Sequence, residues 1–235
     1  MLIPLAMLFT MWLVFWYERK FNVDLLDYGI FPRTISGLKG IVFSPFLHGD
    51  VSHLFNNSIP IVVLLSALRF FYRAVFYRIL GYGWFLSGML TWIVGRDSYH
   101  IGASGIIYVL ASFIFFSGLQ SKYYRLVALS FAVILVYGGL IWFVFPDVQQ
   151  GISWEAHLSG FMVGLIFSKT FAVPSYEKIY KYDWEQPNYD ASQDKFMQRF
   201  DENGNFQNIP KVEESWEYFT SNLDVIYTIK KESNS

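Results

Sequence analysis

The sequence predicts an all-α, polytopic membrane protein with six transmembrane helices and a polar C-terminal tail. Of its 235 residues, 54% are hydrophobic, 20% are aromatic and only 16% are charged, whereas about 25% of the residues in a typical soluble domain are charged. Six apolar stretches each approach the roughly 20 residues that a spanning helix needs. Five of the six contain no Asp, Glu, Lys or Arg, and the helices of a water-soluble bundle need a polar face.

The six stretches comprise residues 2–17, 51–68, 79–95, 102–119, 126–146 and 156–171. The sixth carries one charge, Lys169, near its end. The first stretch has neither the positively charged start nor the small-residue cleavage site of a secretory signal peptide, so we expect a retained helix. Residues 1–171 are therefore predicted to form one membrane domain.

The composition changes after the sixth stretch. Residues 173–235 contain twelve acidic and seven basic residues, together with Pro174, Pro187, Gly204 and Pro210. This pattern predicts that residues 172–235 form a polar tail, partly ordered at most. If the N-terminus is cytoplasmic, the inner connections and the start of the tail hold eight Lys or Arg residues and the outer connections hold five. This bias favours cytoplasmic N- and C-termini.

Several classes of function are excluded or disfavoured. The absence of cysteine excludes disulfides, thiolate metal sites and a cysteine nucleophile. A net charge of −1 with no basic patch argues against a nucleic-acid partner, because such binding depends on clustered Lys and Arg. We recognise no organelle-targeting segment, so a bacterial cytoplasmic membrane is the expected location.

A serine between small residues opens the fourth stretch. Ser104 lies in the segment GASGIIY, with Gly102, Ala103 and Gly105 around it. The first N–H groups of a helix have no intrahelical partner, so an oxyanion beside Ser104 would be stabilised. The small neighbours allow another backbone to approach the hydroxyl. A simpler interpretation is a serine in a small-residue contact between helices, which GxSG alone does not exclude.

A histidine opens the sixth stretch in the segment AHLSGFMVG. His157, Gly160 and Gly164 form one stripe along the predicted helix. The two glycines favour close packing on a neighbouring helix, and the helix of Ser104 is the natural partner. His157 would then lie within reach of the hydroxyl, as a general base requires. A single buried histidine that bonds to a neighbouring helix is the alternative.

The second stretch begins with HGDVSHLFNN. His53 and Asn57 are four residues apart and share a helix face. Both side chains can donate hydrogen bonds, which suits an oxyanion site in a poorly hydrated cavity. His48 precedes the helix and is expected to order the loop. A zinc site of His48, His53 and His157 ranks lower, because there is no HExxH motif and Asp50 is the one nearby carboxylate.

The ordered set of HxxxN, GxSG followed by a Tyr four residues after the Ser, and AHxxGxxxG resembles the rhomboid family of intramembrane serine proteases. The resemblance covers about residues 1–171. It implies a dyad of Ser104 as nucleophile and His157 as general base, with Tyr108 packed against the His157 ring. It also implies that His53, Asn57 and the Ser104 backbone N–H form the oxyanion site. No metal or cofactor is implied, and neither Asp50 nor Glu155 is expected to act as a third catalytic member.

The resemblance further implies that the substrate is a transmembrane protein, cut in or near its membrane segment at a cavity open to the outer side. The partners are therefore expected to be membrane protein substrates, single-span ones in the first instance, and membrane lipid. The chain departs from many bacterial members, whose long first loop contains a Trp-Arg pair, because residues 18–50 contain no Trp. Arg33, Tyr28 and Phe31 are the candidates to take the place of that pair.

Two other classes of function stay open from the sequence. One is a catalytically silent relative that binds membrane clients without cutting them. The other is a small transporter or channel with His53, Asn57 and His157 along a polar pathway, although the chain shows none of the repeated halves that are common in transporters.

Overall fold

The computed structural model describes residues 2–121, 123–146, 148, 151–171 and 181–208. The chain divides into two units, residues 1–177 and residues 178–235. Two segments of the expected tail, residues 172–180 and 209–235, lie outside the described residues. The predicted boundary between residues 171 and 172 falls at the edge of the first of these segments.

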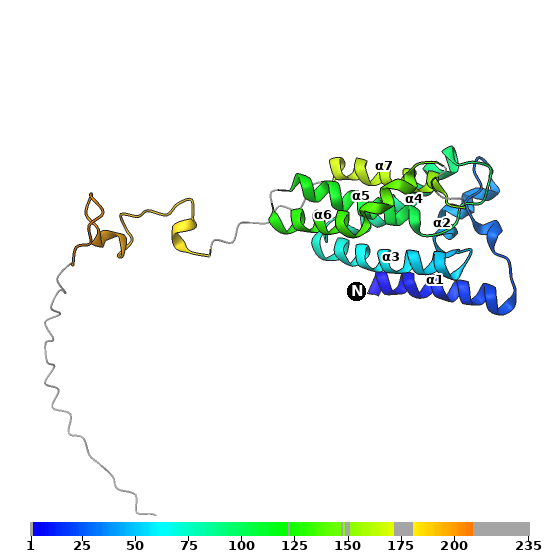
Figure 1. Ribbon diagram of the computed structural model, residues 1–235, viewed down its shortest axis with the longest axis horizontal. Helices are drawn as coiled ribbons and strands as arrows, with labels where there is room; N and C mark the ends of the chain where they lie inside the picture. Colours follow the sequence, from blue (N-terminus) through cyan, green and yellow to red (C-terminus); the bar gives the residue numbers. More distant parts are fainter. Residues whose placement is uncertain (1, 122, 147, 149–150, 172–180, 209–235) are drawn as a thin grey trace, which may run out of the picture. The chain divides into compact units, whose positions relative to one another are not determined.

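The described part of the first unit is helical, apart from its connecting loops and one isolated β-bridge. Its longer helices fall on the six predicted stretches (Figure 1), and they are α1 (Leu2–Phe21), α3 (Val51–Phe71), α4 (Phe76–Val94), α5 (Ser104–Gln120), α6 (Tyr124–Tyr137) and α7 (Trp154–Thr170). The shorter elements lie in the connections, and they are α2 (Gly40–Phe43) and the 3₁₀ helices η1 (Leu26–Tyr28), η2 (Ser36–Lys39), η3 (Ser44–Phe46) and η4 (Gly138–Val144).

The fifth stretch differs from the prediction of a single helix over residues 126–146. The α-helix α6 ends at Tyr137, and the chain continues as the 3₁₀ helix η4. The change occurs at Gly138 and Gly139, and glycine is a poor residue for the interior of an α-helix. The break has a consequence for the site, because it leaves backbone carbonyls of η4 free to bond to side chains of other helices.

Within the described residues, three segments are long and apolar enough to cross a membrane: Leu2–Phe21, Val51–Phe71 and Tyr124–Val144. Helix α5 is also apolar but has only 17 residues. At 1.5 Å per residue it rises about 26 Å, slightly less than the hydrocarbon core of about 30 Å. The chain is therefore a helical membrane protein in which α5 is slightly shorter than the hydrocarbon core is thick.

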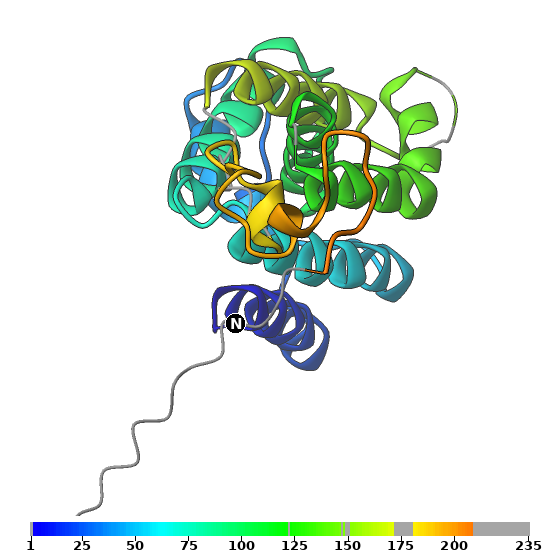
Figure 2. The ribbon, with the colours of Figure 1, turned by 90° about the vertical axis from the view of Figure 1, so that its left-hand side faces the viewer.

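Helix α5 occupies the centre of this unit and contacts α3, α4, α6 and α7, whereas α1 packs along α3 at the edge (Figure 2). Accordingly, long stretches of α5 are buried, including Leu110, Phe113 and Ile114. Helices α3, α5 and α7 all begin at the same end of the unit. A Cβ atom at Gly102, just before α5, would touch the ring of His53 in the first turn of α3, and His157 in the first turn of α7 stacks on Tyr108 of α5.

The loop between α1 and α3 packs against the middle and the C-terminal half of α4. Trp84 donates an indole N–H to the carbonyl of Ile41 at 2.7 Å, and Trp92 donates to the carbonyl of Thr34 at 2.8 Å. A β-bridge joins Ile30 of this loop to the segment that leads into α5. The first loop is therefore joined to α4 by two tryptophan side chains and to the segment before α5 by a backbone bridge.

The described part of the second unit contains short turns. It holds the 3₁₀ helices η5 (Asp183–Glu185) and η6 (Met197–Arg199) and one β-bridge between Phe200 and Phe206. Carboxylates of Asp190, Asp194 and Asp201 accept backbone N–H bonds in these turns.

Candidate active site

Ser104 is the first residue of α5, at the end of the segment that leads from α4. Two residues earlier, Gly102 has a φ of +105°, a backbone conformation that side chains disfavour, and its N–H donates to the carbonyl of Ser44 at 2.8 Å. The half-buried Ser104 hydroxyl has no hydrogen-bond partner in the described part of the chain. It stands at a helix start, where backbone N–H groups and the helix dipole favour negative charge.

His157 lies in the first turn of α7 and is 7% exposed. Its Nδ1 is 2.9 Å from the carbonyl oxygen of Phe143 in η4. Because a carbonyl oxygen can only accept, Nδ1 carries the proton in the neutral ring, and Nε2 keeps its lone pair. The break in the fifth stretch thus fixes the tautomer in which Nε2 can receive a proton.

Tyr108 holds the other side of this imidazole. The two rings are stacked, with centroids 4.4 Å apart and planes at 16°. The Tyr108 hydroxyl donates to the carbonyl of Leu140, also in η4, at 2.6 Å. Tyr108 is one turn after Ser104 on the same face of α5. The His157 ring therefore packs against the face of α5 that also bears Ser104. The starts of α5 and α7, which carry Ser104 and His157, therefore lie against each other, with a Cβ atom at Gly105 3.6 Å from the carbonyl oxygen of Ala156.

The glycine stripe of α7 lies directly against α5. A Cβ atom at Gly160 would collide with the carbonyl oxygen of Gly105, and one at Gly164 would collide with that of Val109. Gly105 itself is less confined, because a Cβ atom there would stay 3.6 Å from the carbonyl oxygen of Ala156. Close approach of the two helices thus depends on the glycines of α7 more than on Gly105.

His53 and Asn57 face the segment before Ser104. A Cβ atom built on Gly102 would be 2.6 Å from Nε2 of His53 and 3.7 Å from Nδ2 of Asn57. The Asn57 amide already donates one hydrogen to the carbonyl of His53 at 2.9 Å, which leaves its second hydrogen available. Asn57 is buried, whereas Asn56 is exposed. His53 and Asn57 are thus the hydrogen-bond donors by which α3 approaches the start of α5.

His48 lies in the loop before α3 and is buried, with 4% of its surface exposed. Its ring meets the His53 ring edge to face, with centroids 4.9 Å apart. Burial, followed by the nearby His53, lowers the pKa of His48 to about 4, so the ring is neutral at physiological pH. Asp50 caps α3 by accepting the His53 backbone N–H at 2.8 Å, a structural use of this carboxylate.

The loop residues Arg33, Tyr28 and Phe31 bind other parts of the protein. Arg33 forms an ion pair with Asp97 and donates to the carbonyl of Gly95 at 2.6 Å. Phe31 packs edge to face on Tyr99, and Tyr28 packs on Phe43. These residues hold the first loop together and join it to the turn after α4.

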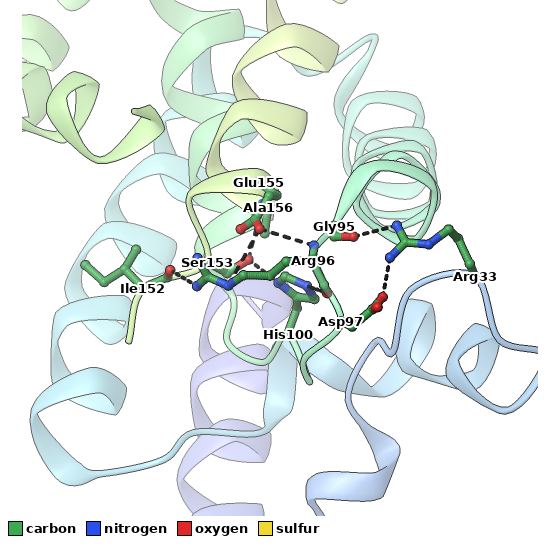
Figure 3. A network of polar contacts seen from close by, with 9 residues as sticks. All are labelled: Arg33, Gly95, Arg96, Asp97, His100, Ile152, Ser153, Glu155 and Ala156. Carbon is green, nitrogen blue, oxygen red and sulfur yellow. Dashed lines mark hydrogen bonds and ion pairs between the residues drawn. The ribbon is translucent and has the colours of Figure 1, made fainter. Parts of the chain in front are cut away.

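A polar cluster that none of the sequence motifs indicated lies on the same side of the site. It contains Arg96, His100, Ser153 and Glu155, which link the turn after α4 to the start of α7 (Figure 3). One signal was present in the sequence, because Glu155 is the only acidic residue next to the histidine of the sixth stretch and Arg96 is the basic residue of the connection before Ser104.

The fold and the site define an all-helical membrane protein whose polar residues gather at the starts of three packed helices. Residues 36–173, more than half of the chain, match the Rhomboid domain. The chain therefore belongs to the rhomboid family.

The chain is also similar to several individual proteins. Uncharacterised proteins of Mycobacterium tuberculosis and Mycobacterium bovis are each 32% identical to the chain over 154 residues, which cover 62% of this chain and 64% of each relative. The chain thus spans less than two thirds of the length of these relatives. A protein of Acanthamoeba polyphaga mimivirus, provisionally described as a rhomboid protein, is 28% identical over 150 residues, which cover 61% of this chain and 81% of that protein.

Proposed function

We propose that this chain is an intramembrane serine endopeptidase that cleaves transmembrane proteins in or near their membrane segments. The observation that carries the proposal is the state of His157. Its Nδ1 is occupied by the Phe143 carbonyl and its ring is held against Tyr108, so Nε2 is the free basic atom beside the helix start that bears Ser104. A base held in this tautomer, on a helix packed against the one that begins with the serine, supports nucleophilic catalysis by Ser104.

In this mechanism, Ser104 Oγ attacks the scissile carbonyl carbon while His157 Nε2 takes the hydroxyl proton. The carbonyl oxygen becomes an oxyanion, which the Ser104 backbone N–H, Asn57 and His53 stabilise. His157 then gives its proton to the leaving amine as the C–N bond breaks. Water attacks the carbonyl carbon of the resulting ester while His157 Nε2 takes one of its protons, and the imidazole then gives this proton to Ser104 Oγ as the ester C–O bond breaks and the acid product leaves. No metal or cofactor takes part in these steps.

Ser104 and His157 form no hydrogen bond within the described residues. This is compatible with the mechanism, because catalytic hydrogen bonds are often long without substrate and tighten in the substrate complex.

The proposed membrane arrangement has all six longer helices as spans and both termini in the cytoplasm, in a bacterial cytoplasmic membrane. Helices α3, α5 and α7 then begin on the outer side. Because α5 is shorter than the hydrocarbon core is thick, Ser104 at its outer end would lie below the outer lipid surface. A substrate helix of weak local helicity would unwind there to present its backbone to the hydroxyl.

The test is cleavage by the purified protein, reconstituted in lipid, of a panel of single-span reporter proteins. We expect the native chain to cleave at least one reporter and Ser104→Ala to cleave none. Ser112→Ala is the matched control, because Ser112 lies on the same helix and its hydroxyl bonds across to the carbonyl of Phe161 in α7 at 2.8 Å, a structural role. This control should retain cleavage.

A fluorophosphonate probe provides a second measurement, because it reacts with an activated serine whichever substrate the enzyme takes. Labelling that is lost in Ser104→Ala and kept in Ser112→Ala would support the proposal. Absence of both labelling and cleavage in the native chain would favour a silent relative that binds membrane clients. Solute flux that survives Ser104→Ala would favour a transporter or channel.

A further inference from the structure

A buried carboxylate lies two residues before His157. Glu155 is 2% exposed, in the first turn of α7. Its Oε1 accepts the backbone N–H of Arg96 at 3.2 Å and lies 3.7 Å from Nε of the same arginine. Its Oε2 is buried without a hydrogen-bond partner among the described residues. A buried carboxylate is costly unless it is paired, so the pair with Arg96 is needed for this helix start to fold as it does.

Arg96 holds the start of α7 at two points. Besides its contact with Glu155, its Nη2 donates to the carbonyl of Ile152 at 2.6 Å, just before the helix (Figure 3). Arg96 belongs to the connection that runs from α4 to Ser104. One guanidinium therefore joins the segment that leads to the proposed nucleophile with the helix that carries the proposed base.

His100 makes a second link between the same two segments. Its Nε2 is 3.1 Å from the carbonyl oxygen of Arg96, so Nε2 is the donor and Nδ1 keeps its lone pair. Nδ1 contacts the hydroxyl of Ser153, which also caps α7 by accepting the N–H of Ala156 at 3.3 Å. The hydroxyl can donate to the imidazole and accept from the helix at the same time, which satisfies all three groups.

We propose that Arg96 and Glu155 are positioning residues that set the register between the start of α5 and the start of α7. The inference rests on the proposed function, because in the proposed enzyme this register aligns Ser104 with His157. Between the two helices, Gly160 and Gly164 provide close contact without side chains that interlock. The Tyr108–His157 stack and the hydrogen bond from Ser112 to Phe161 restrain the helices further along their contact, and the polar tie adds a restraint at the helix starts.

A positioning role predicts a change in kcat more than in KM. Neither Arg96 nor Glu155 is placed against the substrate, so substrate binding should change by about twofold or less. A displacement of about 1 Å between reacting groups can cost about a hundredfold in rate. Loss of one partner of the tie should displace them by less than that, so we expect kcat to fall about tenfold.

The experiment compares Glu155→Gln, Arg96→Gln and the double variant with the native chain, all reconstituted in lipid. Asp97→Asn is the matched control, because Asp97 is in the same turn but pairs with Arg33 on the side away from α7, and its side chain is 78% exposed. The measurements are kcat and KM for a cleaved single-span reporter, the rate of fluorophosphonate labelling of Ser104, and thermal unfolding in detergent.

We expect each single variant to lose about tenfold in kcat and in labelling rate, with KM nearly unchanged. The double variant should be no less active than either single variant, because the effects of two residues that act through one contact are not additive. Arg96→Lys should be intermediate, since a lysine can reach only one of the two acceptors. Asp97→Asn should resemble the native chain.

Unchanged kcat in both single variants would overturn the inference, and so would a rise in KM without a fall in kcat. Additive losses of kcat in the double variant would also overturn it. The same holds for a loss of activity that disappears once activity is expressed per folded molecule. If Glu155→Gln does not fold, Arg96→Lys decides, because it keeps a positive charge beside the buried Glu155 carboxylate and the Arg96 side chain is 49% exposed. If the native chain itself neither cleaves nor labels, the proposed function is wrong and the inference falls with it; an active native chain with fully active variants overturns the inference alone.

Discussion

The imidazole of His157 lies flat on the phenol ring of Tyr108, with 4.4 Å between the ring centroids. Both side chains also bond to carbonyls of η4, His157 to Phe143 and Tyr108 to Leu140. The proposed base is therefore held on one face by α5 and at one nitrogen by the segment after α6. Its orientation depends on three separate parts of the chain.

The first prediction separates the ring of Tyr108 from its hydroxyl. Tyr108→Phe keeps the stack and removes the bond to Leu140, which should cost about 1 kcal/mol of stability and leave kcat within about threefold of the native value. Tyr108→Ala removes the stack, and because an aromatic pair is worth up to about 1.5 kcal/mol beyond burial, kcat should fall about tenfold. Kinetics on a reporter substrate and thermal unfolding in detergent provide both values; equal activity of the two variants would contradict the role of the ring.

The second prediction concerns the oxyanion donors. Asn57→Ala should lower kcat about a hundredfold, the usual cost of one such donor, while Ser104 remains chemically reactive. Asn56→Ala is the control, because Asn56 is the preceding residue of α3 but is exposed, and its removal should have little effect. Similar losses from both variants would remove Asn57 from the oxyanion site.

The third prediction concerns the contact between α5 and α7. Gly160→Ala would place a methyl group against the carbonyl of Gly105, and such overpacking should destabilise the fold by about 1–3 kcal/mol. Gly81→Ala is the comparison within α4, because nothing lies within 4 Å of a Cβ atom there; it should be neutral or stabilising by up to about 1 kcal/mol. Thermal unfolding of the two variants in the same detergent checks the difference, and equal unfolding temperatures would argue against the close contact.

The fourth prediction is a pH dependence of stability. Burial lowers the pKa of His48 to about 4, whereas the unfolded side chain titrates near 6.5. The unfolded state thus binds more protons between these values, so stability is complete above about pH 6.5 and falls as the pH decreases towards 4, by up to about 1.4 kcal/mol per pH unit.

His48→Asn should flatten this decline, because the amide can still donate to the Phe46 carbonyl but does not titrate. A smaller slope should persist, since burial also lowers the pKa of His100. Unfolding temperatures of the native chain and of His48→Asn, measured from pH 7.5 to 4.5, provide the comparison. Parallel curves for the two proteins would show that His48 is not the titrating group.

Much of the fold follows from the sequence because burial in lipid demands long uncharged segments, and these can be read from composition. The six expected stretches agree with the longer helices to within a few residues at most ends; for example, residues 51–68 were expected and α3 comprises Val51–Phe71. The break of α6 at Tyr137 was not predicted. Hydropathy does not report it, because η4 is as apolar as the helix before it.

The candidate site was predictable only as a set of residue types at helix starts. Spacing placed Ser104 and Tyr108 on one face of a helix, and His157, Gly160 and Gly164 on one stripe of another. It could not show that the carbonyls of Phe143 and Leu140 would hold the histidine and tyrosine side chains, because backbone carbonyls are present at every residue and residue spacing does not show which of them will face the site.

The sequence by itself thus determined that the chain is a helical membrane protein, where its helices lie, and which few polar side chains sit at their starts, because a hydrocarbon solvent leaves little choice of residue. The tertiary structure decided which of these side chains meet, which nitrogen of His157 is free, and that Arg96 and Glu155 join two segments 59 residues apart in the chain. Such contacts depend on how the helices pack against one another, and a local sequence pattern does not specify which distant segments will pack together.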